Sequence, residues 1–263
     1  MVHAFQRIDD WRAARARAGR MLLALDFDGT LAPIVPRPDE AALLPSAHTA
    51  LARLLQRADT IVAVVSGRAL ADVRARVGLE AVHYAGNHGL EIEGPGGVHR
   101  LHDEAELARP ALAACAQALR ADFAGDETIL VEDKRLSLSV HFRLVADSAR
   151  ERAIRDQVER RCGDPRHGLR LTDGKKVVEI RPAVDWDKGR ATGFLVDTLL
   201  NGAMHAPVVY IGDDRTDEDA FAILRGRGEG VLVADGVPAS SQALAWLRSP
   251  DEVVTLIDRL AED

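Results

Sequence analysis

Two aspartates in the segment LALDFDGTLAPI, Asp26 and Asp28, have a spacing that points to chemistry. Asp26 is the last residue of the apolar run 21–26, and Asp28 lies two residues further along. The run predicts a buried parallel strand, and α/β sheets place their ligands at the carboxyl ends of such strands. Residues two apart on an extended chain point the same way. Two carboxylates held so close need a divalent cation or a shared proton to relieve their repulsion. A pair of solvated loop acids is the alternative, which the apolar strand before them and the Gly-Thr after them disfavour.

A second group of acids stands in the segment IGDDRTDEDAF. Asp213 and Asp214 follow the apolar run 208–212, another predicted buried strand, so they lie where a metal ion would be reached. Asp217 and the two acids after it open the next predicted helix, where acids in the first turn commonly favour the helix dipole. Oxygen-only ligation by a few carboxylates suits Mg²⁺, which keeps several waters and pairs with phosphate.

A hydroxyl and a lysine are expected at the same edge of the sheet. Ser66 ends the apolar run 61–65, and the helix predicted over 69–77 directs its N-terminal amides toward that edge, which suits a phosphate. Helix capping is the alternative role for this serine. Lys188 opens another predicted helix, a position that the helix dipole disfavours for a cation. An ammonium there would balance the carboxylates and a transferring phosphoryl group.

Together these groups describe phosphoryl transfer through an aspartyl phosphate. The chain resembles the haloacid dehalogenase (HAD) superfamily of phosphatases, whose four motifs match DFDGT, SGR, Lys188 and GDDRTDED in the same order. This resemblance implies that Asp26 is the nucleophile. It also implies that Asp28 protonates the leaving group and later activates water.

The resemblance further implies how the other groups act. Ser66 and Lys188 would hold phosphoryl oxygens. Mg²⁺, the implied cofactor, would be bound by Asp26, by the backbone carbonyl of Asp28 and by Asp213. Two further acids would lie close to the ion, Asp214 and Asp217.

The order of predicted elements favours an α/β fold, a Rossmann-like parallel-sheet core with an inserted α+β cap domain. The core alternates strands with helices. Its expected strands are 21–26, 61–65, 81–86, 208–212 and 230–234, and its expected helices are 46–58, 69–77, 188–200 and 217–224. A further helix at 7–18 belongs to no motif.

The middle of the chain predicts a helix over 104–121, a hairpin, a helix over about 147–161 and a second hairpin around Asp173-Gly174. This order suits a small domain with an open antiparallel sheet. We therefore expect a discontinuous catalytic core of residues 1–103 and 183–263. The insert, residues 104–182, is expected to be a cap that selects the substrate.

Three segments in and beside the insert, GNHGLE, VEDKRLSLSVHFR and GKKVVEIRP, resemble trehalose-6-phosphate phosphatases. In that family, charged and polar cap residues bind the sugar hydroxyls and the phosphate. The resemblance implies hydrolysis of trehalose 6-phosphate to trehalose and phosphate. The implied substrate-binding residues are Gly67, Arg68, Asn87, His88, Glu132, Lys134, Arg143, Lys175 and Glu179.

Other interpretations stay open. Glu132 and Lys134 lie two apart and can form an exposed charge pair, and His88 and His141 can be structural histidines. A related capped phosphatase for sucrose 6-phosphate or mannosyl-3-phosphoglycerate would carry the same core motifs. From another class, a catalytically silent sensor of a sugar phosphate is possible, although no catalytic group is missing.

Composition excludes several functions. The 263 residues are 47% hydrophobic and carry a net charge of -7, which suits a globular protein and argues against nucleic acid as the main partner. No apolar stretch approaches the roughly 20 residues of a membrane helix, and the first 20 residues lack the apolar core of a secretory signal. Cys115 and Cys162 give neither a disulfide framework nor the C-x5-R loop of cysteine phosphatases. We expect a cytoplasmic enzyme, a monomer, acting on a small sugar phosphate.

Overall fold

The computed structural model describes residues 1–174, 176–203, 205–236 and 240–262. They form two compact units. The first unit contains Met1–Val35, Asp39–Arg100 and Trp186–Asp263, and the second contains Pro36–Pro38 and Leu101–Asp185. Within the described residues, no helix is both long and apolar enough to span a bilayer.

A nine-stranded sheet is the centre of the first unit, in the order β1-β13-β12-β11-β2-β3-β4-β5-β6. The neighbours from β1 to β4 pair in parallel, and β5 pairs antiparallel with β4. The strands are β1 (Val2–His3), β2 (Met21–Leu25), β3 (Thr60–Val65), β4 (His83–Gly86), β5 (Glu91–Gly94), β6 (Val98–Leu101), β11 (Val208–Gly212), β12 (Glu229–Val233) and β13 (Ala245–Leu247).

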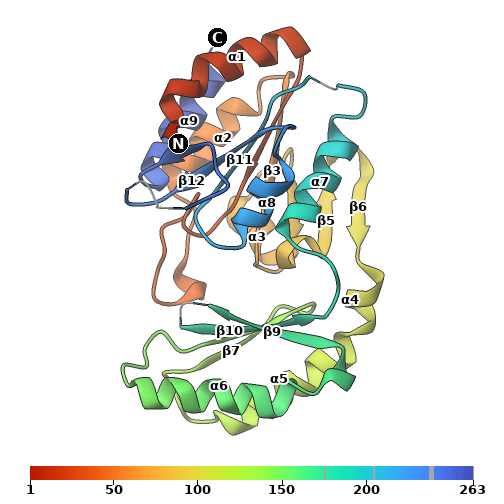
Figure 1. Ribbon diagram of the computed structural model, residues 1–263, viewed down its shortest axis with the longest axis vertical. Coiled ribbons are helices and arrows are strands. Elements are labelled where there is room, and N and C mark those ends of the chain that lie inside the picture. Colours follow the sequence, from red (N-terminus) through yellow and green to blue (C-terminus); the bar gives the residue numbers. More distant parts are fainter. Residues whose placement is uncertain (175, 204, 237–239, 263) are drawn as a thin grey trace. The chain divides into compact units, whose positions relative to one another are not determined.

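Helices cover both faces of this sheet (Figure 1). Alternate residues of β2 divide between the two layers: Leu23 and Leu25 pack with α1, α2, α3 and α9, and Leu22 and Ala24 pack with α7 and α8. Burial on both faces explains why the strand is a continuous apolar run. The helices are α1 (Ile8–Ala18), α2 (Pro45–Leu54), α3 (Leu70–Val77), α7 (Lys188–Leu199), α8 (Asp217–Ile223) and α9 (Pro250–Ala261).

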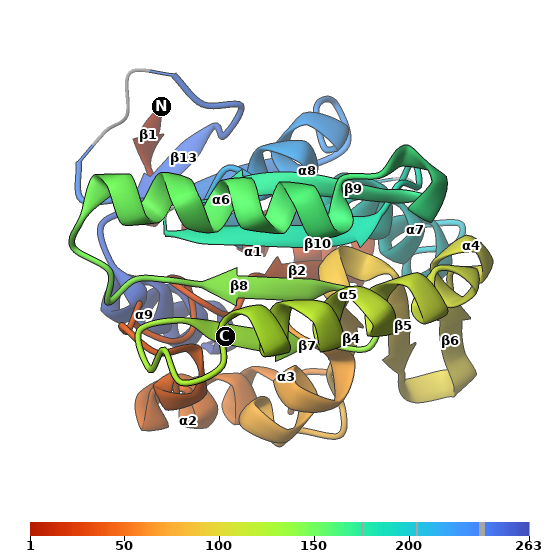
Figure 2. The same ribbon diagram turned by 90° about the horizontal axis from the view of Figure 1, so that it is seen from below.

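The second unit contains an antiparallel four-stranded sheet in the order β7-β8-β10-β9. Two long helices, α5 and α6, pack on one face of it through apolar side chains (Figure 2). The elements are α4 (Asp103–Leu107), α5 (Arg109–Asp122), β7 (Leu130–Asp133), β8 (Leu138–His141), α6 (Ser148–Cys162), β9 (Leu169–Gly174) and β10 (Val177–Pro182). The predicted fold class, a parallel α/β core with an α+β insert, is confirmed.

Three predicted elements differ from the structure. The helix expected over 46–58 ends at Leu54, because the N–H groups of the next residues turn back to carbonyls of its last turn. The helix expected over 104–121 is divided at Ala108, where a proline at position 110 opens α5 and cannot continue α4. The second hairpin does not turn at Asp173-Gly174, since both residues lie within β9 and pair with Val178 and Val177 of β10.

Candidate active site

The end of β2 places Asp26 in the interior of the first unit, with 4% of its surface exposed. Its backbone N–H donates to the carbonyl of Ile211 on β11, which fixes the strand end against its neighbour. One carboxylate oxygen, Oδ1, accepts the N–H of Phe27 at 2.7 Å, and Oδ2 lies 2.8 Å from Lys188 Nζ. Burial raises the pKa of Asp26 well above its ordinary range, although the Lys188 ammonium acts in the opposite direction.

Lys188 begins α7, and its ammonium lies between two carboxylates. Nζ is 2.8 Å from Asp26 Oδ2 and 2.9 Å from Asp217 Oδ1, and the residue is 2% exposed. Burial lowers the pKa of Lys188, but the charges of Asp217 and Asp26 outweigh it and raise the pKa well above the ordinary value. The ammonium therefore stays charged inside the protein.

Asp217 opens α8 as predicted, but its carboxylate is buried and does not cap the helix. Oδ1 accepts from Lys188 and from the Tyr210 hydroxyl, the latter at 2.7 Å. Oδ2 accepts the backbone N–H groups of Asp213 and Asp214, each at 3.0 Å. A carboxylate has about four acceptor positions, and four donors fill them here. Asp217 thus holds the lysine and the backbone of the acidic loop together.

Asp213 lies against the turn that carries Gly29. Gly29 has a φ of +76°, and a Cβ built on it would stand 2.0 Å from Asp213 Oδ2, so both the backbone conformation and the space require glycine. Burial, together with the charges of Asp217 and Asp214, raises the pKa of Asp213 to about 8. The two acidic loops of the sequence are therefore in close contact.

The acidic side chains of this unit fit a hard divalent cation. Oxygens of Asp26, Asp214 and Asp217 lie within 4.8 Å of one another, with Asp213 next to them. Since Asp217 has its oxygens filled by donors, the other three acids are the ones suited to ligation. Burial and mutual repulsion raise the pKa values of Asp26 and Asp213, a cost that a bound cation removes. An all-oxygen donor set is typical of Mg²⁺.

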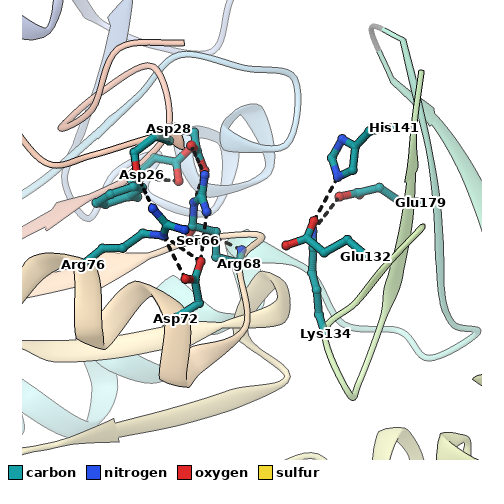
Figure 3. Close-up of polar contacts among 12 residues, drawn as sticks. Asp26, Asp28, Ser66, Arg68, Asp72, Arg76, Glu132, Lys134, His141 and Glu179 are labelled. Carbon is teal, nitrogen blue, oxygen red and sulfur yellow. Dashed lines mark hydrogen bonds and ion pairs between the residues drawn. The ribbon is translucent and has the colours of Figure 1, made fainter. Parts of the chain in front are cut away.

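Asp28 is held by an arginine. The Arg68 guanidinium donates from Nε to Asp28 Oδ2 at 2.8 Å and from Nη2 to Oδ1 at 2.7 Å (Figure 3). Its Nη1 donates to Asp72 at 2.9 Å, and Asp72 in turn accepts from Arg76. Burial lowers the pKa of Arg68, but its bonds to Asp28 and Asp72 more than compensate and raise it. Arg68, predicted to bind substrate, forms ion pairs with Asp28 and Asp72, two acids of its own unit.

Ser66 and its neighbours form a tight loop after β3. The Ser66 hydroxyl accepts the N–H of Arg68 at 3.2 Å, and the residue is fully buried. It does not cap α3, whose N-cap position is Ala69. Gly67 lies against the ring of His88, where a Cβ would come within 2.8 Å.

The loop after β4 holds Asn87 and His88 in left-handed conformations, with φ of 50° and 58°. The N–H of Asn87 donates to the Arg68 carbonyl, and that of His88 to the Ser66 carbonyl, so this loop is bonded to the serine loop. The Asn87 amide donates to Glu91 Oε1 at 2.7 Å, and the same oxygen accepts the first N–H of α3 at 3.0 Å. Sequence reasoning missed Glu91, because nothing in its spacing indicates that it ties two loops together.

Glu132 and Glu179, two of the predicted sugar-binding residues, lie in the second unit on the face of its sheet opposite α5 and α6. Glu132 and Glu179 both pair in register with Ser139, which stands between them on β8. Lys134 Nζ is 3.7 Å from a Glu132 oxygen and 3.9 Å from a Glu179 oxygen (Figure 3). His141 bonds Glu132 at 2.9 Å. The unit therefore brings two acids, a lysine and a histidine together.

The other two residues predicted for the cap are Arg143 and Lys175. Arg143 follows β8 by two residues. Lys175 lies outside the described residues. Arg181, which the sequence analysis did not single out, has its Nε 3.6 Å from Glu179 and donates to Thr172. Its alternation with Glu179 along β10 is the signal that would have found it.

Known proteins resemble this chain in both sequence and fold. The sequence profile of the trehalose-phosphatase family matches residues 24–243. A trehalose-phosphate phosphatase of Mycobacterium tuberculosis is 43% identical over 240 residues, which are 90% of this chain, and the chain spans only 60% of that relative's length.

Solved structures agree in fold. The C-terminal domain of C. albicans trehalose-6-phosphate phosphatase aligns with a TM-score of 0.79 at 21% identity, covering 97% of this chain and 96% of that one. A haloacid dehalogenase-like hydrolase from Bacteroides thetaiotaomicron aligns with a TM-score of 0.62 at 15% identity, covering 91% and 99%. With the profile covering most of the chain and the four motifs gathered at one sheet edge, this chain belongs to the trehalose-phosphatase family of the haloacid dehalogenase fold.

Proposed function

We propose that this chain is a Mg²⁺-dependent phosphatase that hydrolyses trehalose 6-phosphate to trehalose and phosphate through an aspartyl phosphate. The observation that carries the proposal is the buried Asp26 carboxylate, 2.8 Å from the Lys188 ammonium and within 4.8 Å of the oxygens of Asp214. A carboxylate so placed can attack phosphorus, while a fixed ammonium stabilises the phosphoryl oxygens.

The first half-reaction transfers the phosphoryl group to the protein. An Asp26 oxygen forms a bond to phosphorus as the ester P–O bond breaks, and the electron pair of that bond leaves on the sugar oxygen. Asp28 gives its proton to this oxygen, so trehalose departs neutral. Arg68 fixes the direction of the Asp28 carboxylate by its two bonds.

The second half-reaction restores the enzyme. Asp28, now ionised, takes a proton from a water molecule whose oxygen attacks phosphorus, and the bond from phosphorus to Asp26 breaks. On this proposal, Ser66 and Lys188 hold phosphoryl oxygens throughout. When bound by Asp26, Asp213 and the backbone carbonyl of Asp28, with Asp214 beside them, Mg²⁺ supplies charge compensation for the phosphoryl group.

The second unit, on this proposal, is the cap that selects the disaccharide. Its polar face carries Glu132, Lys134 and Glu179, and hydroxyl-rich ligands are recognised by such charged hydrogen-bonding groups. Arg143 and Lys175 are further candidates for the sugar and its phosphate. Asn87 and His88, in the loop bonded to Ser66, are the candidates for substrate binding in the first unit.

Phosphate release across a panel of esters tests the proposal. The panel holds trehalose 6-phosphate, sucrose 6-phosphate, glucose 6-phosphate and mannosyl-3-phosphoglycerate, each with Mg²⁺ and with a chelator. We expect a strong preference for trehalose 6-phosphate that the chelator abolishes. Metal-dependent preference for another ester would overturn the substrate and leave the core chemistry. Release from none of them would overturn the enzyme itself and favour a silent sugar-phosphate sensor.

A further inference from the structure

Tyr210 is a buried polar residue of the core sheet that the mechanism above does not use. It lies in the middle of β11, inside the apolar run VVYIG, and its side chain is inaccessible. The ring packs edge-to-face on Phe221 of α8, with centroids 5.8 Å apart. From the sequence alone it is an ordinary core aromatic.

The hydroxyl of Tyr210 contacts the charged groups of the site. It donates to Asp217 Oδ1 at 2.7 Å, and the same oxygen lies 2.9 Å from Lys188 Nζ. Lys188 in turn reaches Asp26 Oδ2 at 2.8 Å. One continuous chain of contacts therefore connects the phenol, through one carboxylate and one ammonium, to the proposed nucleophile.

The ammonium of Lys188 is shared between the carboxylates of Asp217 and Asp26. How strongly each one attracts it depends on the negative charge that its oxygen presents. A hydrogen bond from Tyr210 withdraws part of that charge from Asp217 Oδ1 and weakens its attraction for Lys188. Burial and the Asp217 charge raise the pKa of Tyr210 well above its usual value, so the hydroxyl stays a donor.

We propose that Tyr210 is a positioning residue, whose hydroxyl acts through Asp217 to hold the Lys188 ammonium where it serves Asp26 and the phosphoryl group. The inference rests on the proposed function, because it assigns Lys188 a part in phosphoryl transfer. Loss of the hydroxyl leaves Asp217 with a stronger pull on Lys188, away from Asp26. Turnover then falls, while the cap residues that bind the sugar are untouched.

The chain provides a matched control in its other tyrosine. Tyr84 on β4 is also buried, at 2% exposure, and its hydroxyl donates to the Leu79 carbonyl at the same 2.7 Å. That carbonyl belongs to the backbone beyond α3 and to none of the proposed catalytic groups. Tyr84→Phe therefore removes a buried tyrosine's hydroxyl bonds, here to the N–H and carbonyl of Leu79, without touching the site.

The experiment compares Tyr210→Phe, Tyr84→Phe and the unaltered chain in Mg²⁺-dependent hydrolysis of trehalose 6-phosphate, with kcat and KM determined separately. Because Tyr210→Phe loses a hydrogen bond to a charged group, we expect its kcat to fall about tenfold and its KM to stay within about twofold of the unaltered chain. Tyr84→Phe is expected to keep kcat within about twofold while losing similar thermal stability. Equal kcat values for the two variants, or a change in KM alone, would overturn the inference.

A spectroscopic measurement keeps the inference testable should Tyr210→Phe unfold. The sequence holds two tyrosines, so 3-fluorotyrosine incorporated into the Tyr84→Phe variant labels Tyr210 alone. We expect its ¹⁹F resonance to shift when Mg²⁺ and inorganic phosphate are added, and an unmoved resonance would contradict the coupling. If the unaltered chain prefers another ester, the proposed substrate fails, and the same comparison on that ester still decides the role of Tyr210.

Discussion

Arg68 holds both carboxylate oxygens of Asp28, with Nε at 2.8 Å from one and Nη2 at 2.7 Å from the other. This paired geometry fixes the plane of the carboxylate as well as its position. Arg68 is itself held in place, since Asp72 accepts a hydrogen bond from its Nη1 and the centroid of the Phe27 ring lies 5.3 Å from its Cζ. Asp28, which the proposed mechanism requires to give and take a proton, is thus oriented by a buried cation.

Replacing Arg68 by lysine tests this orientation. Lysine keeps the charge but cannot make two parallel bonds, so we expect kcat to fall about 10- to 100-fold with a smaller change in KM. Steady-state hydrolysis of trehalose 6-phosphate measures it. The control is Arg74→Lys on α3, the helix that follows the Arg68 loop, whose exposed pair with Glu93 lies 3.2 Å apart and is expected to matter little. A loss confined to KM would return Arg68 to substrate binding.

Asp26→Asn tests the nucleophile. An amide of the same shape keeps the hydrogen bond from Phe27 but cannot form an acyl phosphate, so we expect turnover to fall by more than about a thousandfold. Phosphate release under single-turnover and steady-state conditions gives the residual rate, and circular dichroism checks the fold. Substantial residual turnover by a folded variant would contradict covalent catalysis.

The sequence predicts this site because the residues that could react or bind follow the ends of predicted strands. The apolar runs before Asp26, Ser66 and Asp213 predict parallel strands, and their carboxyl ends meet at one edge of the sheet. That argument places residues but does not choose their partners. Arg68 is the last residue of the SGR motif, yet only the folded loop shows its contact with Asp28.

Other features were beyond sequence reasoning for a physical reason. Tyr210 lies in an apolar run, and the bond that gives it significance joins it to α8 through the interior. Glu91 caps α3 from a different strand. In the second hairpin, Asp173 and Gly174 pair with Val178 and Val177, and the local Asp-Gly sequence does not predict that register. For Tyr210 and Glu91 the deciding partners are distant in the chain, whereas for the hairpin the register between β9 and β10 decides.

The raised pKa of Asp213 makes stability depend on pH and metal together. Burial, Asp217 and Asp214 raise it to about 8 in the folded chain without a cation, against about 4 in the unfolded chain. The folded chain therefore binds the extra proton between these values, and its stability falls as the pH rises through the folded pKa. A cation beside the ionised carboxylate removes that loss.

We expect the increase in Tm caused by Mg²⁺ to be a few degrees larger at about pH 8.5 than at about pH 6. Thermal unfolding in Mg²⁺ and in chelator, at each pH, measures the difference. Asp213→Asn is the control, because the amide does not titrate and its variant should show a flatter dependence. The same Mg²⁺ effect at both pH values would contradict the assignment.

Gly29 connects backbone geometry to the acidic site. Gly29→Ala would place a methyl group 2.0 Å from Asp213 Oδ2, at a φ of +76° that alanine adopts poorly. Gly19→Ala is the matched control, with a φ of +67° and no atom within 4 Å of the added Cβ. Both variants should lose about 1 kcal/mol to backbone strain, measured by denaturant unfolding. Only Gly29→Ala should also lose activity and require more Mg²⁺. Equal activity of the two variants would show that Gly29 does not affect the acidic site.

Residues on the polar face of the second unit are expected to select the substrate. Glu132 pairs with His141 at 2.9 Å and lies near Lys134, on the face of β7 opposite the helices. If these groups bind sugar hydroxyls, Glu132→Gln should reduce kcat/KM for trehalose 6-phosphate by about 10- to 100-fold, because a charged hydrogen-bond partner is lost. Hydrolysis of p-nitrophenyl phosphate, which has no sugar, should change less than about threefold.

The neighbouring residue supplies the control for that comparison. Asp133 follows Glu132 on the same strand, points to the other face and accepts the N–H of Arg135 at 2.9 Å. Asp133→Asn is expected to leave both substrates unchanged. An equal loss on the two esters for Glu132→Gln would assign Glu132 to the stability of its unit, since a group that recognises the sugar affects only the ester that has one.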